Sequence, residues 1–175
     1  MDGKLVERAR AGDADAFDQL VRERLDAVYR LALGILGDAA DARDASQEAF
    51  VAAWRKLPSL RDASRFEPWL DQITVNACRM ALRKKRTVRE IRLLPEADFP
   101  AADRSAAAAQ AMAVAFDAAF ERLSVEQRAL LLDHHLDGRG VDEIAARLGI
   151  PVGTAKSRLF AARKALEAAL KDGAQ

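Results

Sequence analysis

Apolar residues recur at intervals of three and four along most of the chain, which is the spacing of amphipathic helices. The first such run predicts a helix over residues 17–35 that ends at Gly37, with Asp38 as the N-cap of the next helix. That next helix carries an apolar stripe over residues 42–57 and stops at Pro58. We therefore expect two consecutive packed helices in the first third of the chain.

A third apolar stripe begins near residues 67–68 and continues into the basic run at 83–86. The pattern then breaks, because residues 93–104 hold two prolines and several acids without a helical period. This segment predicts a linker, which could extend to about residue 110. The alanine-rich stretch that follows has larger apolar residues at helical spacing and predicts a packed helix. These residues are Met112, Phe116, Ala119, Phe120 and Leu123. A capping-box pattern at 124–127 starts another helix.

The elements predict an all-α fold of two small helical domains, residues 1–92 and 105–175, joined by an acidic linker. Half of the residues are hydrophobic but only 6% are aromatic, and few runs alternate with the period of a strand. Such a composition favours helices over sheets. We expect Trp54, Trp69 and Cys78 to lie in the core of the first domain.

Several classes of protein are excluded by composition. A single cysteine rules out an internal disulfide framework and a cysteine-rich zinc site, and favours a reducing cytoplasm. The first ten residues lack the apolar core of a signal peptide, and the longest uncharged stretch has 12 residues, too few to span a bilayer. His134 and His135 are adjacent, so on a helix they point about 100° apart. The sequence thus predicts no membrane insertion, enzyme activity, metal or cofactor.

The net charge of +1 conceals a strong partition along the chain. Residues 61–92 carry nine basic and four acidic groups, and residues 151–175 carry five and two. Residues 93–126, between them, carry two and six. Two basic blocks around an acidic middle predict two separate contacts with a polyanion.

The second basic block belongs to a helix–turn–helix pattern. In its first helix, VDEIAARLG, we expect Ile144, Ala145 and Leu148 to face inward, and Gly149-Ile-Pro151 supplies the turn. The second helix has an apolar face, formed by Ala155, Leu159, Ala162 and Leu166. Its other face is basic, and in this motif the start of the second helix enters the major groove of DNA. The alternative is an ordinary helical hairpin with a solvated basic face.

With these motifs, the sequence resembles the extracytoplasmic-function class of bacterial sigma factors. The segment LSVEQRALLL, followed by VDEIAARLGIPVGTAKSRLFAARKAL, is similar to their region 4. The segments DARDASQEAFVAAWRKL and RFEPWLDQITVNACRMALRKKR are similar to their region 2. The resemblance covers about residues 5–90 and 106–170, in the order of the family.

The resemblance implies a promoter-specificity subunit that binds core RNA polymerase, recognises the −35 and −10 promoter elements and helps to melt DNA. The helix that docks on the coiled coil of the largest polymerase subunit would use Asp41, Asp44, Gln47, Glu48 and Phe50. A solvated acidic helix face is the alternative. The −10 element, held as single-stranded DNA with a flipped base, would meet the 61–66 loop, Asn76 and the basic helix end. The residues implied are Arg61, Ser64, Arg65, Phe66, Asn76, Arg79, Arg83 and Lys84, with Lys85 and Arg86 also near phosphates.

The −35 element, as duplex DNA, would be read from the second helix of the helix–turn–helix. The residues implied are Thr154, Lys156, Ser157, Arg158, Phe160 and Arg163. The chain departs from the family at four places. Ala155 replaces a usual valine, Ala161 a frequent arginine and Met80 a common aspartate, while Asp71 puts an acid beside the expected DNA face.

Further partners follow from the resemblance. They are the polymerase flap and an anti-sigma factor. The anti-sigma factor would hold this protein at the membrane, and the active protein would be at the nucleoid in the cytoplasm. The linker would enter the RNA-exit channel of the polymerase or serve as a solvated tether. Two other functions stay open on the residues alone: a stand-alone helix–turn–helix regulator that binds duplex DNA as a dimer, and a helical interaction protein that binds no nucleic acid.

Overall fold

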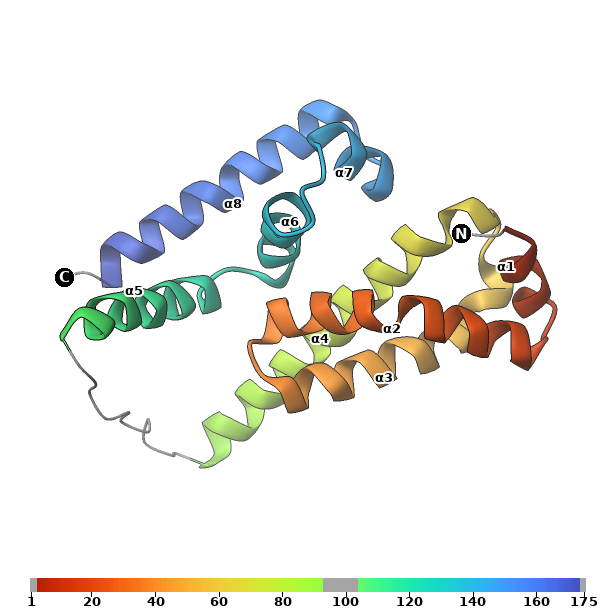
Figure 1. The fold of residues 1–175 in the computed structure, drawn as a ribbon, viewed down its shortest axis with the longest axis horizontal. Coiled ribbons are helices and arrows are strands. Elements are labelled where there is room, and N and C mark those ends of the chain that lie inside the picture. The colour runs from red at the N-terminus through yellow and green to blue at the C-terminus, as the bar shows by residue number, and fades with distance from the viewer. Residues whose placement is uncertain (1–2, 93–103, 174–175) are drawn as a thin grey trace.

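The computed structural model of the protein describes residues 3–92 and 104–173, and in these residues every regular element is a helix. Figure 1 shows the helices as two groups joined by the segment that lies outside the described residues. The elements are α1 (Gly3–Arg10), α2 (Ala14–Leu36), α3 (Ala39–Lys56), η1 (Leu57–Ser59), η2 (Ala63–Arg65), α4 (Phe66–Arg92), α5 (Arg104–Glu121), α6 (Val125–His135), α7 (Val141–Leu148) and α8 (Val152–Gly173), where η marks a short 3₁₀ turn. The all-α prediction is confirmed.

The first group, α1–α4, is built on capped helices around one apolar core. The Asp13 carboxylate accepts the Ala16 N–H at 3.0 Å, and Asp38 accepts the N–H groups of Ala40 and Asp41 at 2.9 and 2.8 Å. Gly37 has φ 71°, the left-handed conformation that ends α2 where the sequence predicts. The core fills the space between α2, α3 and α4 and contains Leu20, Val28, Leu57, Phe66 and Leu70.

The second group, α5–α8, contains the predicted helix–turn–helix. Ser124 and Gln127 form the expected capping box at the start of α6. Gly149, with φ 64°, ends α7 as predicted. Ile144 and Leu159 pack from α7 and α8 into a core shared with α5 and α6.

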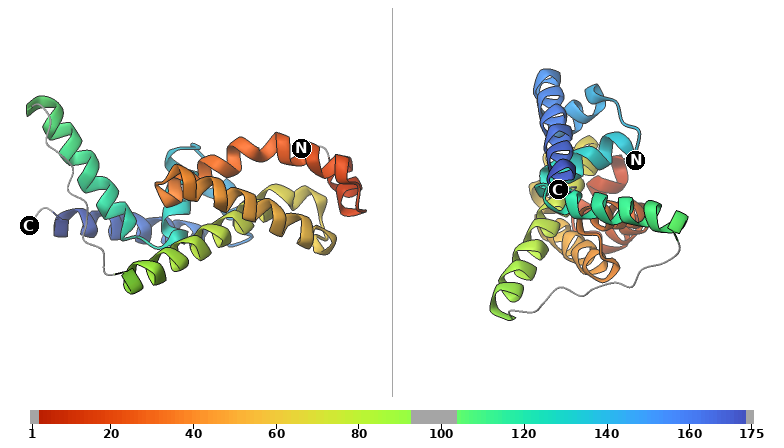
Figure 2. Two further views of the ribbon diagram at one scale, coloured as in Figure 1. Left: turned by 90° about the horizontal axis from the view of Figure 1, so that it is seen from below. Right: turned by 90° about the vertical axis from the view of Figure 1, so that its left-hand side faces the viewer.

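The two groups are packed against each other through α6, which lies on α2 and α4 (Figures 1 and 2). Val125 of α6 belongs to the same buried cluster as Ile35 of α2 and Cys78 of α4. Leu132 sits directly on Gly34, where an added Cβ atom would be 2.8 Å from a Leu132 methyl carbon. The contact between the groups is therefore partly apolar.

Some expectations about the core are wrong. Met112 and Phe116 of α5 are 72% and 43% exposed, although Ala119 and Leu123 are buried as predicted. Leu148 is 40% exposed, because it faces the first group of helices rather than the helix–turn–helix core. Trp54 is exposed at one edge, with its ring 4.8 Å from that of Phe17.

Other predictions differ from the structure in which helices are present and where they begin. Helix α1 has no counterpart among the predicted elements, although its buried Leu5, Val6 and Ala9 have helical spacing. Helix α5 begins at Arg104, so residues 104–110 are helical, and residues 93–103 of the predicted linker lie outside the described residues. No helix in the described ranges is both long and apolar enough to cross a membrane, and no metal-binding group of acidic, histidine or cysteine side chains occurs in them.

Candidate nucleic-acid interface

The predicted −35 residues lie on the solvent side of α8. Ala155, Leu159 and Ala162 are buried at intervals of four and three, which turns the opposite face of the helix outward. The exposed residues of that face are Lys156, Ser157, Arg158, Phe160 and Arg163, and Thr154 is half-buried. The Ser157 hydroxyl donates to the Thr154 carbonyl at 3.0 Å. Apart from Phe160, 68% exposed, the exposed side chains can donate to phosphates or base edges.

The predicted −10 residues lie on η2 and α4. Asp62 caps η2 by accepting the Ser64 N–H at 2.9 Å, and Ser64 and Arg65 are exposed on this short turn, as is Arg61 just before the cap. On α4, Arg79 donates to the exposed Asn76 side chain at 2.6 Å and so fixes the orientation of that amide.

Phe66 requires a correction. It is 1% exposed and lies in the centre of the first core, so it cannot stack on a base in this structure. Its role is to hold the start of α4 in place, with its ring 5.9 Å from that of Trp69, which is half-buried as a core residue. Cys78 is fully buried as predicted, and burial raises the pKa of its thiol to about 12.

The basic end of α4 meets the acidic face of α3. Arg83 and Lys84 are exposed, whereas Lys85 donates to Asp41 at 2.8 Å. This hydrogen bond raises the pKa of Lys85. Asp41 is thus already engaged within the chain, and the Arg86 side chain lies outside the described ones.

The predicted polymerase-binding residues divide into two sets. Asp44, Gln47 and Glu48 are exposed on one face of α3. Phe50 is only 8% exposed and packs in the first core, so its prediction as a docking residue is wrong for this structure. The apolar stripe of α3 already contained Phe50, which was the signal for its burial.

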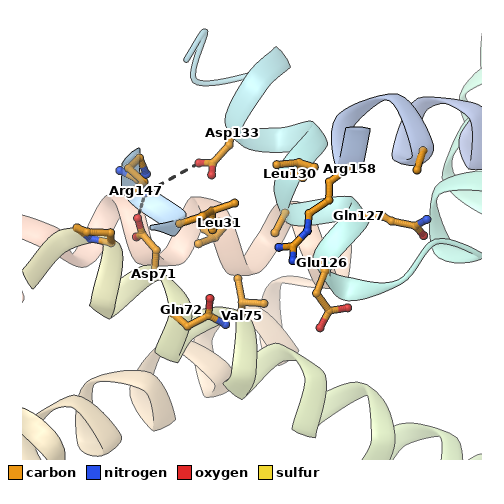
Figure 3. Close-up of a pocket in the computed structure, with 14 residues that line it drawn as sticks. Leu31, Asp71, Gln72, Val75, Glu126, Gln127, Leu130, Asp133, Arg147 and Arg158 are labelled. Atoms are coloured by element: carbon orange, nitrogen blue, oxygen red, sulfur yellow. Dashed lines mark ion pairs between the residues drawn. The ribbon is translucent and has the colours of Figure 1, made fainter. Parts of the chain in front are cut away.

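A cavity of about 280 Å³ lies between the helix groups, and Arg158 is the one predicted DNA-binding residue among the described residues that line it (Figure 3). Figure 3 shows Arg158 of α8 reaching over this cavity towards Glu126 of α6, with Val75 of α4 on the opposite wall. Arg79 of α4 forms an ion pair with Glu126. At the end of η2, the Arg65 guanidinium lies against Gly149, where a Cβ atom would be 2.9 Å from it.

Comparison with known proteins decides the family. The family model for sigma-70 region 2 matches residues 20–88, and that for sigma-70 region 4 matches residues 113–166. The chain is 38% identical over 165 residues to the ECF RNA polymerase sigma factor SigM of Mycobacterium tuberculosis, covering 94% of this chain and 82% of SigM. The chain belongs to the extracytoplasmic-function sigma factors. It is also 33% identical to the ECF RNA polymerase sigma-E factor of Escherichia coli K12, over 95% of this sigma factor and 92% of that one.

Solved structures of sigma factors share the fold. CnrH in complex with the cytosolic domain of CnrY aligns with a TM-score of 0.63 and 28% identity, over 98% of this chain and 97% of CnrH. RpoE of Bartonella quintana, in complex with the anti-sigma factor NepR, aligns with a TM-score of 0.59 and 25% identity, over 89% of this chain and 96% of RpoE. This sigma factor is therefore a promoter-recognising subunit, and the stand-alone dimeric regulator is not favoured.

The contact between the two helix groups involves charged residues that sequence reasoning did not assign. Arg147 of α7 forms an ion pair with Asp71 of α4, and both side chains are largely buried. The sequence marks Asp71 only as an acid beside the expected DNA face. Its partner is 76 positions away in the chain, so no local pattern could have paired them.

Proposed function

We propose that this sigma factor binds core RNA polymerase through the exposed acidic face of α3 and reads promoter DNA from two separate basic faces. The face on η2 and α4 takes the −10 element, where Asn76 pairs with an unstacked base edge and Arg61, Ser64, Arg65, Arg79, Arg83 and Lys84 contact the strand. The face on α8 takes the −35 element through Thr154, Lys156, Ser157, Arg158, Phe160 and Arg163.

The observation that carries this proposal is the outward basic face of α8 behind a glycine turn. A helix–turn–helix reads DNA only if the start of its second helix is exposed. Lys156, Ser157 and Arg158 are exposed there, while Ala155 and Leu159 on either side of them are buried. No chemistry beyond hydrogen bonding and charge neutralisation is needed, in keeping with an initiation factor that is not itself an enzyme.

The direct test is run-off transcription with core polymerase on a library of randomised promoters. The sigma factor is expected to add promoter-dependent transcripts that core polymerase alone does not make. Sequencing the productive promoters would give the −10 and −35 preferences together. If no promoter in the library is used more than with core alone, the proposal fails.

Lys156→Ala is expected to weaken binding to a duplex −35 fragment by about 1–3 kcal/mol if Lys156 contacts a base. If Lys156 contacts a phosphate instead, the variant is expected to release about one counterion fewer on binding, which lowers the salt dependence of the affinity. The matched control is Lys171→Ala, which removes the same charge near the end of α8, where Lys171 pairs with Glu167 at 2.6 Å. Fluorescence anisotropy at two or more salt concentrations measures both effects. Equal losses in the two variants would contradict the placement of the reading face.

Asn76→Ala is expected to reduce open-complex formation about tenfold while leaving duplex −35 binding unchanged, because the Asn76 amide acts on an unpaired base after melting. Gln72→Ala is the control, since Gln72 is another exposed amide one turn earlier on α4. Permanganate footprinting reports strand opening and anisotropy reports duplex binding. Equal losses by Asn76→Ala in both assays would argue against the role in melting.

We further propose that an anti-sigma factor binds this chain and holds it inactive, with the free sigma factor acting at the nucleoid in the cytoplasm. The support is that the CnrH and RpoE structures similar to this chain contain partners described as the cytosolic domain of CnrY and the anti-sigma factor NepR. Core polymerase contacts at the coiled coil and the flap complete the proposal.

A further inference from the structure

Helix α1 precedes the residues 20–88 that match sigma-70 region 2, yet it packs against a segment to which the proposed function assigns the −10 element. The apolar face of α1 is buried in the same core as Leu57 and Leu60, which lie between α3 and α4. Figure 1 shows α1 beside this segment. We refer to residues 60–65, which include three of the proposed −10 contacts, as the −10 loop. Side chains of α1 are thus in a position to act on this loop.

Arg10, the last residue of α1, reaches the main chain of the −10 loop. Its guanidinium Nη1 donates to the Leu60 carbonyl at 3.0 Å and to the Arg61 carbonyl at 3.5 Å. The other terminal nitrogen lies 2.5 Å from the Glu7 carboxylate, one turn earlier on α1, which orients the guanidinium. Among the described residues, neither carbonyl accepts a main-chain N–H. Arg10 is therefore the donor that the fold supplies for both of them.

The second half of the −10 loop is fixed by contacts within the loop itself. The Asp62 carboxylate accepts the N–H and the hydroxyl of Ser64 at 2.9 and 2.7 Å, and the Arg65 N–H donates to the Asp62 carbonyl at 3.1 Å. The first half differs, because the carbonyls of Leu60 and Arg61 are held by a side chain 50 positions earlier in the chain. The conformation from which the Arg61 side chain projects thus depends on α1.

We propose that Arg10 is a positioning residue for −10 recognition, which holds the carbonyls of Leu60 and Arg61 and so presets the −10 loop to receive an unstacked base. Arg10 acts through the loop and makes no contact with DNA in this role. Ordering a flexible segment during binding opposes association, so a loop already in place binds an unstacked base more tightly and selects between bases more strictly. The −10 role of the loop rests on the proposed function, whereas the holding of the loop by Arg10 does not.

Hydrogen exchange in the free protein, measured by mass spectrometry, tests whether Arg10 holds the loop. The N–H groups of Ser64 and Arg65 donate hydrogen bonds within the loop, so their exchange reports how often it opens. Arg10→Met retains the apolar stem but leaves both carbonyls without their donor. The amides of residues 60–66 are expected to exchange about tenfold faster, which is the effect of losing one hydrogen bond to a charged group.

The matched control is Arg8→Met, which removes an arginine from the same helix. Arg8 donates to the Asp13 carboxylate at 2.9 and 2.7 Å, at the turn into α2, so its loss removes hydrogen bonds of the same kind away from the −10 loop. Arg8→Met is expected to leave exchange at residues 60–66 unchanged. Glu7→Gln removes the ion pair of Arg10 but leaves its carbonyl contacts in place, and is expected to change exchange at most twofold.

The effect on −10 recognition is measured with core polymerase on a promoter selected from the randomised library, and on versions of it changed at each −10 position. Arg10→Met is expected to reduce open-complex formation about tenfold and to lower the preference for the selected −10 base over the other bases, while binding to a duplex −35 fragment is unchanged. A protein that is merely less stable would lose activity on all these promoters equally. Arg10→Lys, which retains the charge and can donate to a carbonyl, is expected to recover part of both losses.

Unchanged exchange at residues 60–66 in Arg10→Met, or equally fast exchange in Arg8→Met, would overturn the holding of the loop. Faster exchange with an unchanged base preference would overturn the role in −10 recognition. Reduced opening without faster exchange would show that Arg10 contacts DNA directly, which also overturns the proposal. If the unmodified sigma factor opens no promoter with core polymerase, the proposed function fails, and the exchange result still decides whether Arg10 holds the loop.

Discussion

Reversing two charges on α3, with Asp44→Lys and Glu48→Lys together, is expected to reduce promoter-dependent transcription about 100-fold. Asp44 and Glu48 are exposed one helical turn apart on the same face. If this face docks on a basic partner, the reversal replaces attraction with like-charge contacts that cost several kcal/mol, and about 3 kcal/mol corresponds to 100-fold in affinity. The fold should be unaffected, because both side chains lie at the surface.

The measurement is run-off transcription over a range of sigma concentrations, together with competition for core polymerase against the unmodified sigma factor. The control is Glu23→Lys with Asp26→Lys on α2, which makes the same change in net charge at exposed positions. The α3 variant should lose competition as well as transcription, and the α2 variant neither. A loss of transcription with full competition would place the effect after polymerase binding and contradict the docking role of α3.

Most of the helices could be predicted because their determinants are local. Asp38, Ser124 and Gly149 act within a few residues of their own positions, through caps and a left-handed turn, and the structure has each where the pattern places it. The burial of Ala155, Leu159 and Ala162 likewise follows from helical periodicity alone. The secondary structure and the orientation of most helix faces could therefore be predicted from the sequence.

The errors have two physical causes, which are the contact between the two helix groups and burial within the core of the first group. Leu148 has the spacing of a helix–turn–helix core residue, but its position at the end of α7 turns it towards the other group. Phe50 and Phe66 stand within family motifs for binding, yet their large apolar surfaces are buried in the nearer core. Periodicity identifies which face of a helix is buried, but it does not say which neighbour covers that face.

The buried Arg128 is the other residue for which a large effect is expected. Its side chain is 5% exposed and donates to three main-chain carbonyls: Ile35 at 2.7 Å, Leu123 at 3.2 Å and Glu121. Two of these acceptors belong to the turn between α5 and α6, and Ile35 is at the end of α2 in the other group, where carbonyls lack helical partners. Arg128→Met retains the apolar stem but leaves all three acceptors without this donor. The free energy of unfolding of the second group should fall by about 3 kcal/mol, near 1 kcal/mol for each acceptor.

Urea unfolding can assign that loss to one helix group because both tryptophans, Trp54 and Trp69, lie in the first. Tryptophan fluorescence then follows the first group, and circular dichroism follows both. The part of the dichroism transition that has no counterpart in fluorescence reports the second group. Arg128→Met should move that part to a lower urea concentration. Arg122→Met is the matched control, since exposed Arg122 makes one ion pair, 3.2 Å from Asp172, and its loss should cost about 0.5 kcal/mol. Equal shifts in the two variants would show that the carbonyl contacts of Arg128 contribute little.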